Sequence, residues 1–237
     1  MNFVFLVEGE KTEVKVYKKW VEHSFSQLSF VNSIQDITTD CYCIFPGGGY
    51  PKIFMDDPSP LEVCLTELKN HGDIDHFFIC IDSEEYDYQT RFKEVETELE
   101  ILKEIGIYPS LQTSIHIIVQ HCCIETWFLG NTKMLRKHPQ SNKLLEFKKF
   151  YDVSINDPEL MDCPENYLTK ASFHLDYLKE MLIEQNPNLR YTKKYPGPTT
   201  EKAYLDALRQ RCEKTEHLPS LKRLLDIWDT IYRHSDN

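Results

Sequence analysis

Four short, almost continuous apolar runs occur in the first half of the chain, at residues 3–7, 41–45, 76–81 and 115–119. They read FVFLV, CYCIF, HFFICI and IHIIV, without the alternation of apolar and polar residues that a strand with one solvated face would have. Such runs are typical of strands that are buried on both faces of a sheet. They predict four strands in the core of the fold.

Between these runs, apolar residues recur every three or four positions, which is the spacing of an amphipathic helix. This spacing predicts helices over residues 14–28, 61–68 and 92–105, and a further helix that begins at 124. Alternation of strands and helices indicates right-handed crossovers and a mainly parallel sheet. We therefore expect an α/β fold.

The strand pattern stops near residue 136, whereas helical spacing continues over 168–182, 203–211 and 221–231. The chain is therefore predicted to consist of an α/β domain over residues 1–135 and a helical C-terminal extension over 136–237 that packs on it.

The composition narrows the class of protein. The chain has 237 residues, of which 41% are apolar and 27% are charged, and these proportions exclude disordered, collagenous and coiled-coil proteins. No apolar run approaches the roughly 18 residues that a membrane span needs. The opening MNFVFLVEGE has neither the basic segment nor the long apolar stretch of a secretory signal. We expect a soluble, cytoplasmic protein.

The charge is distributed unevenly along the chain, whose formal net charge is −11. Residues 1–135 contain 10 basic and 22 acidic side chains, a balance of −12, whereas residues 136–237 contain 17 and 16, a balance of +1. The second half is thus the part that can approach a polyanion. Alternatively, the Glu-rich helix near 94–104 supplies only a solvated face.

Eight cysteines are present, none of them in a C-x-x-C pair. This spacing excludes a zinc ribbon and a thioredoxin motif, and His121 next to Cys122 and Cys123 also lacks the spacing of a ligand set. We expect reduced thiols without a metal role. The glycine-rich FPGGGYPK at 45–52 matches neither a dinucleotide-binding nor a P-loop motif, and we interpret it as a turn.

Carboxylates follow three of the predicted strands. Glu8 comes directly after the first, Asp82 directly after the third, with Glu84 two residues later, and Glu125 follows the fourth. The carboxyl ends of parallel strands meet at one edge of a sheet, where ligands bind. Grouped carboxylates repel one another unless they are neutralised, and their hard oxygen atoms suit Mg²⁺ or Mn²⁺.

Each acid also has a purely structural interpretation. Glu8 would be the first solvated residue after a strand, Asp82 a capping residue, and Glu125 a favourable charge in the first turn of a helix. Their grouping at three strand ends favours a metal site, and Gly9 after Glu8 permits a sharp turn or a close approach to a ligand.

Four segments resemble motifs of TOPRIM domains, especially those of the small RloB-like and OLD-type groups. They are VEGEKTE at 7–13, ICIDSEEYD at 79–87, CIETWFLGN at 123–131 and HLPSLKRLL at 217–225. The resemblance covers the N-terminal half well and the C-terminus lightly. It implies a Rossmannoid parallel sheet flanked by helices and a metal-dependent cleavage of phosphodiester bonds.

The resemblance also implies roles for individual residues. Glu8 corresponds to the TOPRIM glutamate, Asp82 to the first acid of an Asp-x-Asp pair, and Glu84 to the second, where it replaces the usual aspartate. Glu13 matches a further acid of OLD-type sites, and Lys193 or Lys194 matches their late lysine. The resulting metal ligands, for one or two Mg²⁺ or Mn²⁺ ions, are Glu8, Glu13, Asp82, Glu84 and Glu125. The catalytic residues are Glu8, Asp82, Glu84 and Lys194.

The leading hypothesis is a Mg²⁺- or Mn²⁺-dependent nuclease that acts on DNA or RNA. The resemblance further implies a role in prokaryotic antiviral defence, together with a separate ABC-type ATPase, because the chain has no Walker A sequence of its own. Two alternatives stay open. One is a non-catalytic TOPRIM-like module that binds a partner ATPase or nucleic acid, which Glu84 and the net negative charge favour. The other is a metal-dependent nucleotide hydrolase.

An acidic site needs basic residues elsewhere to hold nucleic acid. The candidate phosphate contacts are Lys193, Lys194, Arg209 and Arg211 in the C-terminal extension. Tyr191 and Tyr195, beside the lysines, are candidates for stacking on an unpaired base. Alternatively, the basic residues pair with glutamates of the core.

Overall fold

The computed structural model describes residues 1–235, which form two compact units. Unit 1 comprises Met1–Ile81, Gln89–Val119 and the chain from Ile231 onward. Unit 2 comprises Asp82–Tyr88 and Gln120–Thr230.

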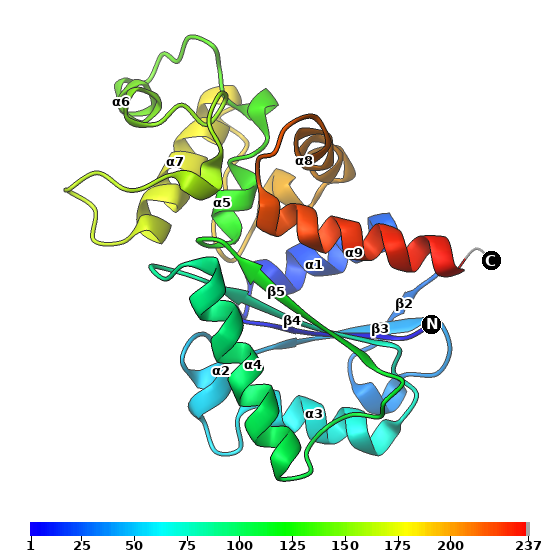
Figure 1. The fold of residues 1–237 in the computed structure, drawn as a ribbon. Helices are drawn as coiled ribbons and strands as arrows, with labels where there is room; N and C mark the ends of the chain where they lie inside the picture. The colour runs from blue at the N-terminus through cyan, green and yellow to red at the C-terminus, as the bar shows by residue number, and fades with distance from the viewer. Residues whose placement is uncertain (236–237) are drawn as a thin grey trace. The chain divides into compact units, whose positions relative to one another are not determined.

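Within the described residues, a five-stranded parallel sheet has the order β2-β3-β1-β4-β5 (Figure 1). The strands are β1 (Phe3–Val7), β2 (Ser29–Phe30), β3 (Cys41–Pro46), β4 (His76–Asp82) and β5 (Ser114–Gln120). The expected α/β class is confirmed, and the four long strands coincide with the four apolar runs to within one residue at each end. The two-residue β2, which pairs with Cys41 and Tyr42 at the start of β3, was not predicted.

The central strand β1 is buried on both faces, and all five of its side chains have 0% exposure. It pairs with β3 on one side, where Val7 is opposite Pro46, and with β4 on the other, where Val7 is opposite Cys80. The ring of Phe5 stacks on that of Phe78 in β4, with centroids 4.6 Å apart. An uninterrupted apolar sequence is what such a position requires.

Four helices belong wholly or mainly to unit 1. They are α1 (Thr12–Ser24), α2 (Lys52–Met55), α3 (Pro60–His71) and α4 (Tyr88–Glu104). Helix α1 covers one face of the sheet, and α3 and α4 lie on the other (Figure 1). The ends of α3 follow from its sequence, since the Ser59 hydroxyl accepts a hydrogen bond from Glu62 N and Gly72 adopts the left-handed conformation that ends the helix.

Helix α1 is shorter than its apolar periodicity predicts. The predicted helix runs to residue 28, but α1 ends at Ser24, and the backbone N–H of Leu28 donates to Phe25 O in a turn. Phe25 and Leu28 are nevertheless buried. The apolar residues of this turn therefore continue the three- to four-residue spacing of the helix, although they lie outside it.

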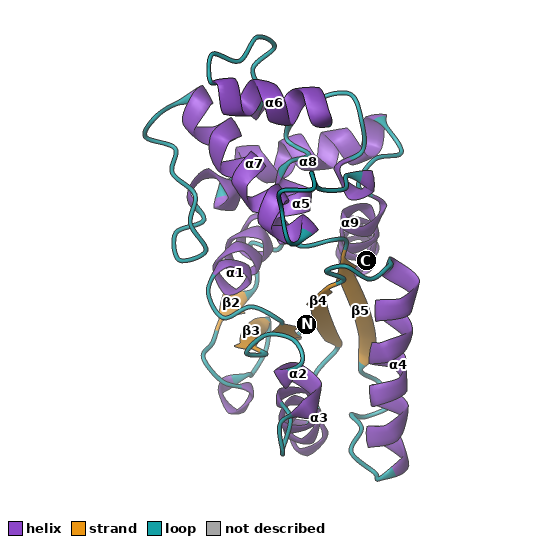
Figure 2. Ribbon diagram, turned by 90° about the vertical axis from the view of Figure 1, so that its left-hand side faces the viewer, coloured by secondary structure: helices purple, strands orange, loops and turns teal. Residues whose placement is uncertain are grey.

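Unit 2 is built from helices of different lengths, several of them joined by long connections. They are α5 (Ile124–Phe128), α6 (Asn142–Phe150), α7 (Lys170–Gln185), α8 (Lys202–Lys214) and most of α9 (Pro219–Ser235). Helix α7 packs against both α5 and α6 (Figure 2). Short 3₁₀ helices occur in unit 2 at Thr132–Met134, Pro158–Leu160 and Gly197–Thr200, and in unit 1 at Ile34–Asp36. Across residues 1–235, no helix combines the length and the apolar composition that crossing a bilayer requires.

A pair of histidines on neighbouring strands of unit 1 makes the stability depend on pH. His76 Nδ1 lies 3.0 Å from His116 Nε2, and the His116 ring stacks on Phe78. Burial, together with the neighbouring His76, lowers the pKa of His116 to about 4. Burial also lowers the pKa of His76, against the opposing influence of Asp75.

We expect the protein to lose stability as the pH falls from about 6.5 to about 4. Over this range the unfolded chain takes up a proton at His116 that the folded chain does not, so acid favours unfolding, by roughly 3 kcal/mol at the lower end. Urea denaturation at a series of pH values measures the effect. The variant His116→Gln should flatten the profile, whereas His138→Gln, at an exposed position, should not. Equal profiles for the two variants would contradict this assignment.

Candidate active site

Glu8 lies at the carboxyl end of β1, with 7% exposure. Its backbone N–H donates to Cys80 O at 2.9 Å, which extends the pairing of β1 with β4 by one residue. Its backbone carbonyl accepts from Gly49 N at 2.9 Å, and its side-chain Oε1 accepts from Tyr50 N at 3.2 Å. The strand therefore delivers Glu8 to the sheet edge, and the loop after β3 holds its carboxylate there.

This loop is the glycine-rich segment that the sequence predicts as a turn. Gly48 and Gly49 have φ values of 78° and 92°, which a residue with a side chain rarely adopts. These conformations allow two successive backbone N–H groups, of Gly49 and Tyr50, to face Glu8. The role of the loop in holding Glu8 was not predicted, although three consecutive glycines after a strand were the available signal.

Tyr50 is itself fixed by helix α4. Its hydroxyl donates to Glu94 Oε1 at 3.0 Å, and the guanidinium of Arg91 lies 3.9 Å from the centre of its ring. Arg91 has 0% exposure and forms an ion pair with Glu94. Tyr50 therefore contacts the buried Arg91 through its ring and the Glu8 carboxylate through its backbone N–H.

Glu13, in the first turn of α1, is the second buried acid of unit 1, with 6% exposure. Its carboxylate occupies the space beside Gly9, so that a Cβ atom built on Gly9 would lie 1.6 Å from Glu13 Oε2. Gly9 thus leaves space for the Glu13 carboxylate, which a larger residue at this position would displace, and it does not adopt a left-handed conformation.

Asp82 and Glu84 belong to unit 2, at and just beyond the end of β4. Ser83 between them is fully buried, and its backbone N–H donates to Gln120 O at 3.0 Å. Glu84 is exposed, has a φ of 52°, and donates its backbone N–H to Cys122 O at 2.8 Å. Asp82 is half-buried, so the two acids differ in their access to water.

Glu125 lies in the first turn of α5 with 3% exposure, and its Oε1 accepts a hydrogen bond from the Tyr191 hydroxyl at 2.8 Å. Tyr191 is buried and packs edge-on against Phe128. The expectation that Tyr191 stacks on a base is therefore wrong, because its ring is covered and its hydroxyl orients a carboxylate.

The lysines of the same segment are exposed. Lys193 and Lys194 lie in a tight turn closed by two backbone hydrogen bonds between Thr192 and Tyr195. Tyr195 is 62% exposed, and Lys194 Nζ lies 5.5 Å from the centre of its ring. Lys193, Lys194 and Tyr195 are therefore all surface residues.

The two arginines in α8 differ sharply. Arg209 forms an ion pair with Asp229, in which its Nη1 donates to both carboxylate oxygens at 2.7 Å. Arg211 is 7% exposed, and its guanidinium donates to the carbonyl oxygens of Gly130, Val153 and Asn156. It also lies 2.8 Å from His217 Nδ1. Arg211 thus ties together three segments of unit 2.

Two of the quoted motifs meet inside unit 2. Trp127, from CIETWFLGN, donates its indole N–H to the hydroxyl of Ser220, from HLPSLKRLL, at 2.7 Å. Ser220 in turn donates this hydroxyl to Glu159 Oε1 at 2.6 Å. Glu159 is buried, which raises its pKa to about 8. The two motifs therefore form one buried network at the start of α9.

The structure also brings together the side chains of Cys122, Cys123 and His174, a group that was not predicted from the sequence. All three are buried, and their potential ligand atoms lie within 4.8 Å of one another. The histidine follows the cysteines by about 50 residues, too far for any spacing rule to find it.

Comparison of the chain with protein-family models, with curated proteins and with solved structures finds no match. The TOPRIM resemblance therefore rests on the sequence motifs alone.

Replacing Arg211 by alanine should destabilise unit 2, because three carbonyl groups would lose a charged donor in a buried place. We expect the free energy of unfolding to fall by about 3 kcal/mol. Arg209→Ala, which removes a partly exposed ion pair, should cost about 1 kcal/mol or less. Urea denaturation of the two variants measures the difference. An Arg211 variant as stable as the Arg209 variant would contradict the structural role.

Proposed function

We propose that the chain is a TOPRIM-type nuclease that hydrolyses phosphodiester bonds of DNA or RNA with Mg²⁺ or Mn²⁺. The observation that supports this most is the pair of buried carboxylates, Glu8 and Glu13, at the carboxyl end of the central strand of a parallel sheet. Buried carboxylates are costly unless they are protonated or neutralised by a cation.

The position of Glu8 in the topology supports a ligand site. After β1 the chain adds β2 and β3 on one side of it, and then crosses to add β4 and β5 on the other. In open parallel sheets, ligands bind at the carboxyl ends of the strands where the direction of winding reverses. The strands on either side of this reversal are β1 and β4. Glu8 follows β1 directly, and Asp82 is the last residue of β4.

The donor set of unit 1 fits a hard divalent cation. Carboxylate oxygens of Glu8 and Glu13 are the ligands that Mg²⁺ and Mn²⁺ prefer. Such an ion would polarise the scissile phosphate and lower the pKa of a bound water. In this proposal Asp82, Glu84 and Glu125 supply further ligands, and their sharing of an ion with Glu8 stays a prediction from the sequence.

The residues around the acids have distinct tasks. Tyr50 N and the glycine loop hold the Glu8 carboxylate in place, and Tyr191 holds that of Glu125. The exposed Lys193 and Lys194 would contact the nucleic acid, and Lys194 would stabilise the negative charge that develops on the phosphate. A separate ABC-type ATPase as partner, and a role in antiviral defence, complete the proposal.

Glu8→Gln should abolish Mn²⁺-dependent cleavage of plasmid, single-stranded DNA or tRNA, because it removes a ligand charge without changing the size of the side chain. Gly9→Ala should reduce cleavage strongly with all acids retained, because its Cβ displaces the Glu13 carboxylate. We expect Mn²⁺ to stabilise the native chain against thermal unfolding by about 2.7 kcal/mol at a hundred times the dissociation constant, and the same two variants should lose this stabilisation.

Glu10→Gln is the matched control, since Glu10 is exposed and lies in the same segment. It should cleave as the native chain does. Cleavage that persists in Glu8→Gln would overturn the proposal. Mn²⁺ binding without cleavage of any nucleic acid would instead favour the non-catalytic module, and hydrolysis confined to free nucleotides would favour the nucleotide hydrolase.

The double variant Lys193→Ala, Lys194→Ala should weaken nucleic-acid binding and reduce the slope of log K against log salt by about one to two. The control is Lys148→Ala, Lys149→Ala in α6, which removes the same charge from the same unit. Fluorescence anisotropy over a range of salt concentrations measures both. Equal slopes for the two double variants would exclude the Lys193 segment as the binding surface.

A further inference from the structure

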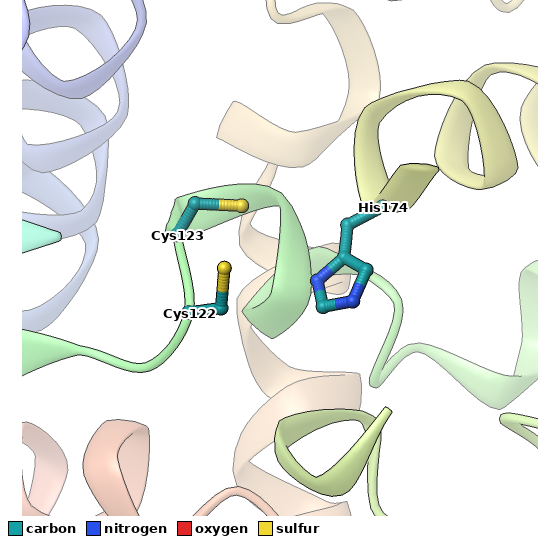
Figure 3. A group of neighbouring side chains, drawn as sticks. All are labelled: Cys122, Cys123 and His174. Atoms are coloured by element: carbon teal, nitrogen blue, oxygen red, sulfur yellow. The ribbon is translucent and has the colours of Figure 1, made fainter. Parts of the chain in front are cut away.

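Two cysteines and a histidine converge in the interior of unit 2. Cys122 and Cys123 precede helix α5, and His174 lies in helix α7. Figure 3 shows the Cys122 sulfur directed toward that of Cys123, with the imidazole ring of His174 to one side of the pair. The three potential ligand atoms lie within 4.8 Å of one another, and all three residues have at most 3% exposure.

We propose that Cys122, Cys123 and His174 form a binding site for a thiophilic divalent metal ion, with Zn²⁺ as the physiological occupant. This site is independent of the proposed nuclease activity. Two sulfurs and one imidazole nitrogen are a donor set that suits Zn²⁺ and not Mg²⁺. The acids of the candidate active site have the opposite preference.

The hydrogen bonds of His174 prepare it as a ligand. Its Nε2 lies 3.1 Å from the carbonyl oxygen of Met161, and because a carbonyl oxygen can only accept, Nε2 carries the proton. The neutral ring then has its lone pair on Nδ1, which lies 2.7 Å from Thr126 Oγ1. A metal-binding histidine usually has this arrangement, with the second ring nitrogen donating to a backbone carbonyl.

All three residues are buried, so a bound ion and its ligands must together be close to neutral in charge. On binding, two thiols release their protons to solvent and two zinc–sulfur bonds form. The positive charges of Zn²⁺ cancel those of two thiolates, which makes the complex neutral and compatible with a buried position.

The spacing requires a modest contraction. Zinc–sulfur bonds of about 2.3 Å and a zinc–nitrogen bond of about 2.0 Å place tetrahedral ligand atoms roughly 3.5–3.8 Å apart. The Thr126 hydroxyl, which also lies 3.5 Å from Cys123 Sγ, gives up its bond to Nδ1 and borders the fourth position. Bound zinc would thus join α7 to the segment before α5.

Titration of the metal-free, reduced protein with Co²⁺ tests the proposal. The native chain should develop the intense sulfur-to-cobalt charge-transfer absorption in the near ultraviolet, which saturates at one Co²⁺ per sulfur site and which Zn²⁺ then removes. Cys122→Ser and Cys123→Ser should lose this absorption, and His174→Gln should weaken binding at least about tenfold. Cys163→Ser, outside the cluster, and Glu8→Gln should keep it.

Absence of the absorption in the native chain would overturn the proposal, as would its persistence in Cys123→Ser. If the variants do not fold, X-ray absorption spectroscopy of the zinc-loaded native chain identifies the atoms that coordinate the zinc ion. It should show two sulfur neighbours near about 2.3 Å and nitrogen or oxygen neighbours near about 2.0 Å. A zinc coordination shell without sulfur atoms would also overturn the proposal.

Discussion

The complete burial of β1 is the constraint on which the arrangement of unit 1 depends. Each of its side chains is excluded from water, and its backbone is paired on both sides. A strand in this position needs helices on both faces and a parallel neighbour on each side, which α1, α3, β3 and β4 provide. The first polar side chain after such a strand can appear only where the strand leaves the core. For β1 that side chain is Glu8.

The surroundings of Glu8 follow from its place at this edge. A carboxylate with 7% exposure requires donors, and the loop after β3 supplies one through Tyr50 N. That loop can turn its N–H groups inward because Gly48 and Gly49 adopt positive φ values. At the next position, Gly9 leaves room for Glu13. The glycines of the loop after β3 thus allow the contact with Glu8, and Gly9 leaves space for the Glu13 carboxylate.

The fold was largely predictable from the sequence, for a physical reason. Strands buried on both faces need uninterrupted apolar runs, and these runs located β1, β3, β4 and β5. The two-residue β2 is too short to leave a pattern, and α6, with Leu144 and Phe147 as its buried residues, offers little more than one turn of periodicity. Its N-cap Ser141, which accepts a hydrogen bond from Leu144 N, was a usable signal.

The site was less predictable, because residues of one chemical type can have opposite environments. Arg209 and Arg211 are two positions apart in α8, yet only Arg211 lies in the helical register of the buried Leu208 and Tyr204. Both were predicted from the sequence as phosphate contacts, but the guanidinium of Arg211 is buried and donates to backbone carbonyls instead. By contrast, no local pattern relates His174 to Cys122 and Cys123, because their proximity arises from the packing of α7 on α5.

The chain thus separates two kinds of potential ligand by their chemistry. In unit 1, the buried Glu8 lies at a sheet edge, where Tyr50 N holds its carboxylate, and the buried Glu13 lies beside Gly9. In unit 2, sulfur and imidazole nitrogen gather inside a helical core, where neutral thiols and a neutral ring are compatible with burial. Oxygen ligands select hard cations, whereas sulfur ligands select thiophilic ones. Mg²⁺ is a poor ion for sulfur ligands, whereas Zn²⁺ also accepts carboxylate oxygens, so of these two ions only Mg²⁺ would discriminate between the two sets of residues.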